Sequence, residues 1–323
     1  MTISSSSAGP HFLGIGVQRG ATGWVFRHLI QHPDVWMPPL KELHYFDVID
    51  PILARPPYRY GQNLKRRLLS AASSVAPRLI PTAWQKKVKV VWDPAWDLRY
   101  FVGRSNMDWY ARLFSHAASQ GKVTGEITPE YCMLSPQVVQ QIAEPFPDVR
   151  PFIILRDPID RSWSSFQLAV RHTARTQQVD DAARCKRFKA FVSNDEDHLN
   201  ARLDYARSIE MWRSAFPGDR LLVTSFDRMR ADPSAFLTSI CTHIGIDTTK
   251  VPADPGLRVN SHQARVGHGL PNYAEATLAE RALPHLRQLA KVDLEPSIQA
   301  DIAAWTQRAE LAIQTERRRS EPV

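Results

Sequence analysis

The sequence predicts an α/β fold, a single domain in which helices flank a parallel β-sheet. Short apolar runs that suit buried strands, at 11–17, 122–125, 151–155 and 221–224, alternate with longer segments that suit helices. Strands that alternate with helices are expected to lie parallel, with helices covering both faces of the sheet. The length of 323 residues supplies a core for one large domain or two small ones without disulfides or metals.

The expected helices are supported by signals at their ends and by the spacing of their apolar residues. Asp157 suits the N-cap and Pro158 the first position of a helix over 159–170. The segment 203–216 places its apolar residues on one helix face. The other expected helices lie at 24–30, at 135–143, at 233–244 and, as a mostly helical region, at 272–315.

The domain is expected over 11–315, between a flexible tail at 1–10 and a charged tail at 316–323. Basic clusters and prolines around 50–105 favour a solvated insertion, with a basic lid over an anionic site as the alternative. The Ser-rich, uncharged start does not resemble a signal peptide, and the longest apolar runs are far shorter than the ~20 residues of a membrane span. We therefore expect a cytoplasmic protein with no membrane span.

The composition is that of a globular protein with a basic surface. Apolar residues make up 43 % and charged residues 23 % of the chain, which excludes wholesale disorder, collagen and a coiled coil. Lysine and arginine exceed acidic residues by 41 − 33 = 8. This excess fits an ordinary solvated surface as well as an anionic ligand. Nucleic-acid binding would rest on net charge alone and is not expected.

The three cysteines, Cys132, Cys185 and Cys241, are widely spaced and form no CxxC motif or Cys/His cluster. A disulfide scaffold and a structural zinc site are therefore not expected, and no residue is predicted to bind a metal.

The loop after the first strand, residues 16–24, has the composition of an anion-binding loop. Its small residues allow the backbone to approach a ligand, and amides at the start of the following helix point toward an anion. Arg19 adds a positive charge and Thr22 a hydroxyl. No Gly-Lys-Ser/Thr follows, so the strict nucleoside-triphosphate motif is absent. A tight structural turn would explain the same residues.

A second cationic group follows the strand at 151–155. Arg156 is expected at the carboxyl end of this strand and Ser164 on the first turns of the next helix. Ligands of parallel α/β sheets bind at that edge, so both groups could meet one phosphate there. The alternative is that Arg156 pairs with Asp157 or Asp160 at the start of the helix.

Four segments in this order resemble the sulfotransferase family that uses 3′-phosphoadenosine 5′-phosphosulfate (PAPS). They are the loop at 18–24, KELHYFD at 41–47, GEITPEY at 125–131 and ILRDPIDRSWSSF at 154–166. The segment 203–229 is also similar, so the resemblance extends over about 11–260. It implies a P-loop-like sheet, and KELHYFD resembles the bacterial, carbohydrate-type members.

The resemblance implies a role for each matching residue. PAPS would be the donor and 3′-phosphoadenosine 5′-phosphate (PAP) the product, with no metal. The loop residues that would bind the 5′-phosphosulfate are Gln18, Arg19, Gly20, Ala21, Thr22, Gly23 and Trp24, the last of which could instead pack in the core. Arg156 and Ser164 would bind the 3′-phosphate. Arg265 and Gly267 lie in the family's late nucleotide loop, where a solvated loop is the alternative.

On the acceptor side, Glu42 would be the general base, with Arg19 and His44 as the other catalytic residues. Lys41, Asp47 and Glu126 would contact the acceptor, a small molecule or a glycan with a hydroxyl or an amine. The ordinary alternative for KELHYFD is a Lys-Glu surface pair with Tyr45 and Phe46 as core anchors.

The chain departs from the family pattern at three positions. Arg19 stands where the family has Lys, Gly23 replaces a Thr, and Ile127 replaces a Lys. Arg keeps the charge but is bulkier and more rigid than Lys. These changes motivate a second hypothesis, a nucleotide-binding relative that has lost catalysis. A nucleotide kinase with a degenerate loop is a third, less favoured one.

Overall fold

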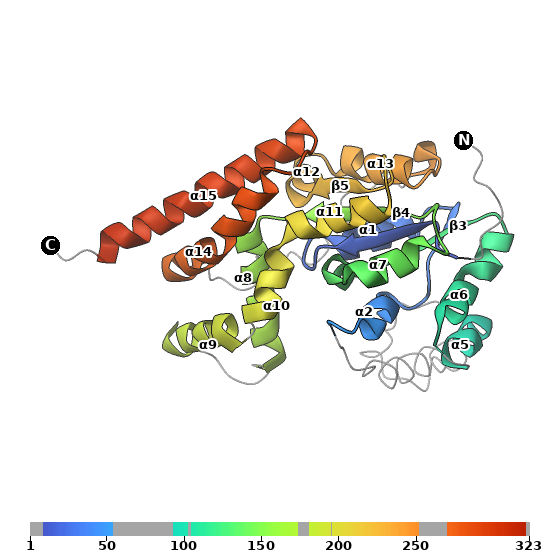
Figure 1. Ribbon diagram of the computed structural model, residues 1–323, viewed down its shortest axis with the longest axis horizontal. Helices are drawn as coiled ribbons and strands as arrows, with labels where there is room; N and C mark the ends of the chain where they lie inside the picture. The colour runs from blue at the N-terminus through green and yellow to red at the C-terminus, as the bar shows by residue number, and fades with distance from the viewer. Residues whose placement is uncertain are drawn as a thin grey trace, which may run out of the picture.

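The computed structural model describes residues 9–53, 93–102, 105–173, 181–194, 196–251 and 270–320 (Figure 1). The expected flexible tail and basic insertion, at 1–10 and 50–105, lie mostly outside these ranges. Arg265 and Gly267 lie outside them altogether.

Within the described residues, five parallel strands form one sheet, in the order β2-β3-β1-β4-β5. The strands are β1 (Phe12–Gly16), β2 (Val35–Trp36), β3 (Val123–Ile127), β4 (Arg150–Leu155) and β5 (Leu222–Ser225). The parallel α/β sheet predicted from the sequence is thereby confirmed. Because β1 lies between β3 and β4, the loops after these three strands meet at one edge of the sheet.

Alternate residues of the central strands pack into two separate cores. Ile153 and Leu155 of β4 belong to one core, and Phe152 and Ile154 to the other. Both cores exclude water from a strand that is apolar on both sides, which is typical of a parallel sheet covered on both faces. This explains why the strands are continuous apolar runs in the sequence.

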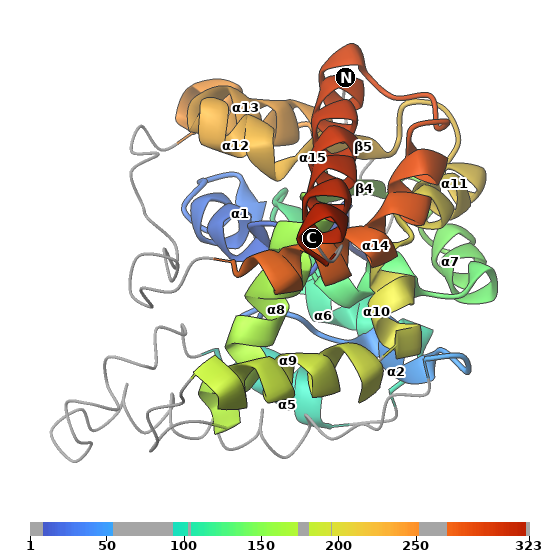
Figure 2. The same cartoon turned by 90° about the vertical axis from the view of Figure 1, so that its left-hand side faces the viewer.

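Helices cover the sheet on its two faces (Figures 1 and 2). The α-helices are α1 (Thr22–Leu29), α2 (Tyr45–Ile49), α5 (Pro94–Phe101), α6 (Met107–Ser119), α7 (Pro136–Ala143), α8 (Pro158–Thr173), α9 (Asp181–Asn194), α10 (Glu196–Leu203), α11 (Tyr205–Ala215), α12 (Phe226–Ala231), α13 (Pro233–His243), α14 (Asn272–Leu289) and α15 (Pro296–Ser320). The described residues also include the 3-10 helices η2 (Pro129–Met133) and η3 (Thr248–Lys250).

The predicted elements agree with these bounds to within a few residues. α15 continues to Ser320, so the described part of the expected charged tail, 316–320, is helical. Several elements were not predicted. β2, α2 and α5 have eight residues or fewer, so their periodicity extends over few positions. α6 and α9, with 13 and 14 residues, were also missed. The buried residues of α6, from Trp109 to Ala117, recur at helical spacing, so this signal was present in the sequence.

The carboxyl-terminal part of the chain forms a pair of helices. α14 and α15 lie side by side, and α14 also packs on α8 (Figures 1 and 2). In the part of the chain described, no helix has the length and apolarity to cross a membrane.

Candidate functional site

The loop after β1 is folded tightly against the end of β4. The amide of Val17 donates to the carbonyl of Ile154 (3.1 Å), and that of Gly20 donates to the carbonyl of Val17 (2.9 Å). Arg19 and Ala21 have φ angles of 72° and 69°, in the left-handed region. A Cβ at Gly20 would lie 2.6 Å from the Ile154 carbonyl oxygen, so the close contact with β4 requires glycine.

The two cationic groups predicted from separate segments converge on one place. The Arg19 Nε donates to Ser164 Oγ (2.9 Å), and the Arg156 Nη1 donates to the Arg19 carbonyl (2.8 Å). Arg19, Arg156 and Ser164 therefore form a single cluster at the carboxyl edge of the sheet. The alternative pairing is wrong, because the carboxylates of Asp157 and Asp160 are bound by Arg308 instead.

Arg156 is buried and held from several sides. Its guanidinium carbon lies 4.5 Å from the centre of the Phe226 ring, and Tyr205 donates to its carbonyl (3.1 Å). Burial lowers the pKa of Arg156, and the nearby carboxylate of Asp160 opposes this. Its Nε is buried without a hydrogen-bond partner among the described residues. A buried guanidinium with an unused donor suits an acceptor that the protein itself does not provide.

The start of α1 directly follows the loop that carries Arg19 and has no side-chain cap. Its N-cap residue, Ala21, provides no side-chain acceptor for the first amides of the helix, which lack intrahelical partners. Together with the helix dipole, such amides favour an anion. Thr22 is buried, whereas a side chain at Gly23 would meet nothing within 4 Å.

Trp24 does not fit the expected role in nucleotide binding. It is 5 % exposed and belongs to the core between α1 and α13, where its ring packs against His28 in a tilted arrangement and meets Phe236 edge to face. The large apolar surface of the indole is buried here, so Trp24 is a core residue, which was the alternative to nucleotide binding.

The KELHYFD segment forms a chain of alternating charges. Lys41 is ion-paired with Glu42, whose Oε2 lies 3.6 Å from Nε2 of His44. The other ring nitrogen of His44 lies 2.7 Å from Asp47 Oδ2. Glu42 and His44 have φ angles of 63° and 54°, so the backbone turns sharply on both sides of Leu43. This turn places the two side chains together.

These contacts set the protonation of Glu42 and His44. Burial alone would raise the pKa of Glu42, but the hydrogen bond from His44 and the charge of Lys41 outweigh it and lower the pKa to about 2. Burial would lower the pKa of His44, but hydrogen bonds to Asp47 and Glu42 raise it to about 9. At neutral pH the pair is therefore a carboxylate and an imidazolium.

Glu126 is placed inside the protein, which does not fit the expected contact with acceptor. The side chain is 2 % exposed, and its carboxylate accepts four hydrogen bonds of 2.7–3.1 Å. The donors are the Leu43 amide and the hydroxyls of Tyr110, Thr128 and Tyr131. The Leu43 amide is the one between the two left-handed residues, so Glu126 fixes the turn. Asp47 is also fully buried and contacts His44.

One contact that the sequence did not predict joins the two halves of the site. Gln18 Nε2 donates to Glu130 Oε1 (3.0 Å), and the charge of Glu130 helps to raise the pKa of His44. The β1 loop and the KELHYFD turn are therefore neighbours through η2. Tyr45 and Phe46 are buried in the core, as expected if they are core anchors.

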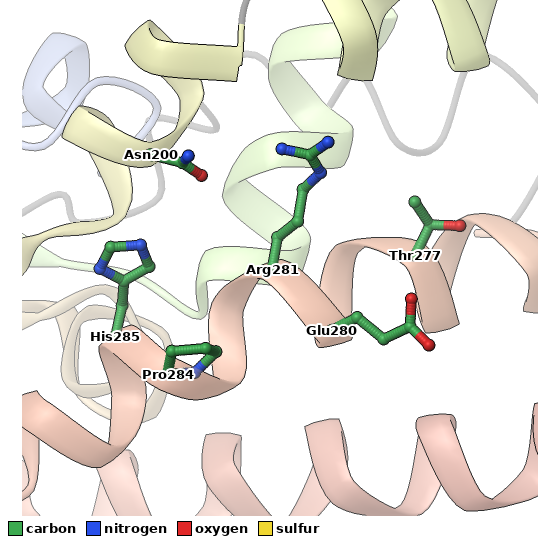
Figure 3. A pocket seen from close by; sticks show the side chains of 6 residues that line it. All are labelled: Asn200, Thr277, Glu280, Arg281, Pro284 and His285. Carbon is green, nitrogen blue, oxygen red and sulfur yellow. The ribbon is translucent and has the colours of Figure 1, made fainter.

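A separate groove of about 560 Å³ lies between α10 and α14 (Figure 3). It is lined by Asn200, Thr277, Glu280, Arg281, Pro284 and His285. Figure 3 shows Arg281 and His285 rising from α14 on the side that faces Asn200. None of these residues belongs to the cluster at the sheet edge.

Comparison with known proteins identifies the family. The model of a family described as "Sulfotransferase family" matches residues 10–250, more than half of the chain. The chain belongs to the sulfotransferase family. Sulfotransferases of this family are transferases that depend on PAPS. The matched region includes both halves of the site.

Individual relatives of the chain are distant in sequence. Heparan sulfate glucosamine 3-O-sulfotransferases 3A1 and 3B1 of Mus musculus are each 23 % identical to it over 150 residues, 46 % of this chain. The match covers 37 % and 38 % of their own lengths. A solved sulfotransferase from Alicyclobacillus acidocaldarius has the same fold, with a TM-score of 0.57 at 20 % identity over 92 % of this chain and 98 % of that one.

Two glycines of the sulfotransferase loop provide a matched pair of substitutions. We expect Gly20→Ala to destabilise the protein by about 1–3 kcal/mol, because the new methyl group meets the carbonyls of Ile154 and Val17 at 2.6 and 2.9 Å. Gly23→Ala is expected to stabilise α1 by up to about 1 kcal/mol. Urea unfolding of both variants measures this, and equal effects would contradict the assigned close contact.

The ion pairs of His44 predict a pH-dependent contribution to stability. Because the pKa of His44 rises from 6.5 to about 9 on folding, the contribution is complete below pH 6.5 and is lost as the pH rises through 9. We expect His44→Gln to be destabilising below pH 6.5 and progressively less so above it. Urea unfolding of both proteins across this range tests it, and a difference that stays constant would show that His44 is not protonated in this way.

Proposed function

We propose that this sulfotransferase moves the sulfuryl group of PAPS to a hydroxyl or amine of a glycan or another small polar molecule. The observation that carries the proposal is the single cluster of Arg19, Arg156 and Ser164, beside the charged turn that contains Glu42. A cationic cluster fits the phosphates and the sulfate of the donor, and the neighbouring carboxylate fits the acceptor proton.

On the donor side, the residues present suit PAPS. The first amides of α1 and the charge of Arg19 suit the 5′-phosphosulfate. Arg156, with its buried and unused Nε, and Ser164 suit the 3′-phosphate. Ser164 accepts from Arg19, and its hydroxyl could at the same time donate to this phosphate.

On the acceptor side, Glu42 would take the proton. The acceptor oxygen or nitrogen forms a bond to sulfur, and the bond from sulfur to the bridging oxygen of the 5′-phosphate breaks. Its electron pair stays on that oxygen, which gives PAP, and the acceptor proton goes to the Glu42 carboxylate. Arg19 would stabilise the charge on the bridging oxygen, because electrostatic stabilisation and positioning dominate group transfers of this kind.

The ion pairs of Glu42 bear on this role. A carboxylate whose pKa is about 2 is ionised at every working pH but binds a proton weakly. The proposal therefore requires the contact with Lys41 to loosen as the acceptor enters, which raises the basicity of Glu42. Asp47 would hold the His44 imidazolium in place beside it, and Lys41 would be released to face the acceptor.

A nucleotide-binding relative without catalysis is the second candidate. It is favoured by Arg19, which stands in place of the Lys expected from the family and is already bonded to Ser164. A guanidinium is a rigid planar fork and cannot follow a moving charge as a compact ammonium does.

Calorimetric titration with PAP, with AMP as the control, tests the donor site. Tight binding of PAP and weak binding of AMP are expected, and equal affinities would refute the proposed donor. Transfer of labelled sulfate from PAPS to desulfated glycans and small polyols then separates the two candidates, since the second predicts PAP binding with no transfer to any acceptor.

A further inference from the structure

We propose that Arg308 on α15 is a positioning residue for recognition of the 3′-phosphate. It neutralises the carboxylates beside Arg156 and so leaves the charge of Arg156 available to the nucleotide. This inference rests on the proposed function, in which Arg156 binds that phosphate. Arg308 lies beyond residues 10–250, the part that matches the family.

The geometry around Arg308 is that of one cation shared by three carboxylates. Its Nη1 lies 2.7 Å from Asp157 Oδ2 and 2.9 Å from Asp160 Oδ1. Its Nε and Nη2 are both 2.8 Å from Oε1 of Glu275 on α14. A guanidinium has the planar fork of donors needed to hold several carboxylates at once. The contacts join α15 and α14 to the first turn of α8.

The two aspartates are close to the proposed phosphate site for structural reasons. Asp157 follows Arg156 directly, and its side chain caps α8 by accepting from the Ile159 amide (2.8 Å). It is buried, and burial raises its pKa while Arg308 lowers it. The charges of Asp160 and Asp157 also act on Arg156. Without a counter-ion, both carboxylates would attract Arg156 and repel a phosphate.

The effect of Arg308 should therefore be specific to the 3′-phosphate. Ser164, the other proposed ligand, is on the same helix one turn further along. A loss of charge at Arg308 would weaken PAP, which has this phosphate, far more than AMP, which lacks it. A role confined to holding α15 in place would instead weaken both nucleotides alike and lower stability.

The test compares Arg308→Met with Arg287→Met by calorimetric titration of PAP and AMP. Arg287 is a matched control, since it also joins α14 to α15, through an ion pair with Glu310 (3.0 Å), but contacts neither aspartate. We expect Arg308→Met to weaken PAP roughly tenfold and AMP by less than about twofold. Arg287→Met is expected to leave both unchanged.

A rescue variant separates charge from structure. Adding Asp157→Asn to Arg308→Met removes one uncompensated charge, while asparagine still caps the helix. Recovery of at least about threefold in PAP affinity is expected. Arg308→Lys, which keeps the charge but cannot hold all three carboxylates, should fold even if the Met variant does not and should lose about threefold.

The outcomes distinguish this inference from the function on which it rests. Equal losses for PAP and AMP in the Arg308 variants, or an unchanged preference for PAP, would overturn the role of Arg308 alone. A wild-type protein with no preference for PAP over AMP would overturn the 3′-phosphate site itself, and the role of Arg308 with it.

Discussion

Replacement of Glu42 by Gln is expected to lower turnover by about 10²–10⁴ and to leave PAP affinity unchanged. The amide keeps the size of the side chain but cannot take the acceptor proton. The hydrogen bonds of the donor cluster join Arg19, Arg156 and Ser164 to one another, whereas Glu42 pairs with Lys41 and His44, so nucleotide binding should not follow the loss of activity. Initial rates of sulfate transfer and calorimetric titration with PAP measure the two quantities separately.

Two controls make this result specific. Glu42→Asp keeps a carboxylate in a residue that tolerates the left-handed conformation found here, and should retain part of the activity. Glu144→Gln changes an exposed carboxylate at the end of α7 and should have no effect. Full turnover in Glu42→Gln would remove Glu42 from the mechanism and leave the acceptor proton to another group.

Replacement of Arg156 by Ala is expected to weaken PAP binding by roughly 1.5–3 kcal/mol, the loss of a charged hydrogen bond. This corresponds to about ten- to 150-fold in the dissociation constant. AMP binding should change much less, because the lost group faces the 3′-phosphate. Titration of both nucleotides with wild type and variant measures the change in selectivity.

The surroundings of Arg156 sharpen this experiment. Arg156→Lys keeps the charge but loses the contact with Phe226 and the bond to the Arg19 carbonyl, and should give an intermediate loss. Arg220→Ala removes an arginine that pairs with the exposed Asp148 and serves as the control. If Arg156→Ala left PAP affinity unchanged, the 3′-phosphate would have to bind elsewhere.

Local patterns in the sequence were sufficient for the architecture. Three such patterns depend only on residues close together in the sequence. They are the continuous apolar runs of the strands, Asp157-Pro158 at a helix start, and the spacing of Ile209, Trp212 and Phe216. The structure agrees: Asp157 caps α8, and those three apolar side chains are at most 1 % exposed. Burial of apolar surface at fixed periods depends on the chain alone, so a parallel sheet between two cores could be predicted.

Single residues were harder to assign, because their role depends on neighbours distant in the chain. Trp24 follows a loop whose composition suits a ligand, yet its ring packs against His28 and Phe236 in the hydrophobic core. Glu126 was expected at the acceptor, yet four donors, among them the Leu43 amide 83 positions away, bind both its oxygens. A glutamate looks the same in the sequence whether it is catalytic or structural, and only its hydrogen-bond partners in the folded protein distinguish the two roles.

The sequence by itself determined the order of the elements, the family resemblance and the residue types available for anion binding and proton transfer. The tertiary structure decided which of them meet: Arg156 with Arg19 and not with Asp157, Gln18 with Glu130, and Arg308 with the start of α8. The physical reason is that helix and strand periodicity depends on residues that are close together in the sequence. Ion pairs and hydrogen bonds form between residues up to 216 positions apart, which only the folded chain brings within reach.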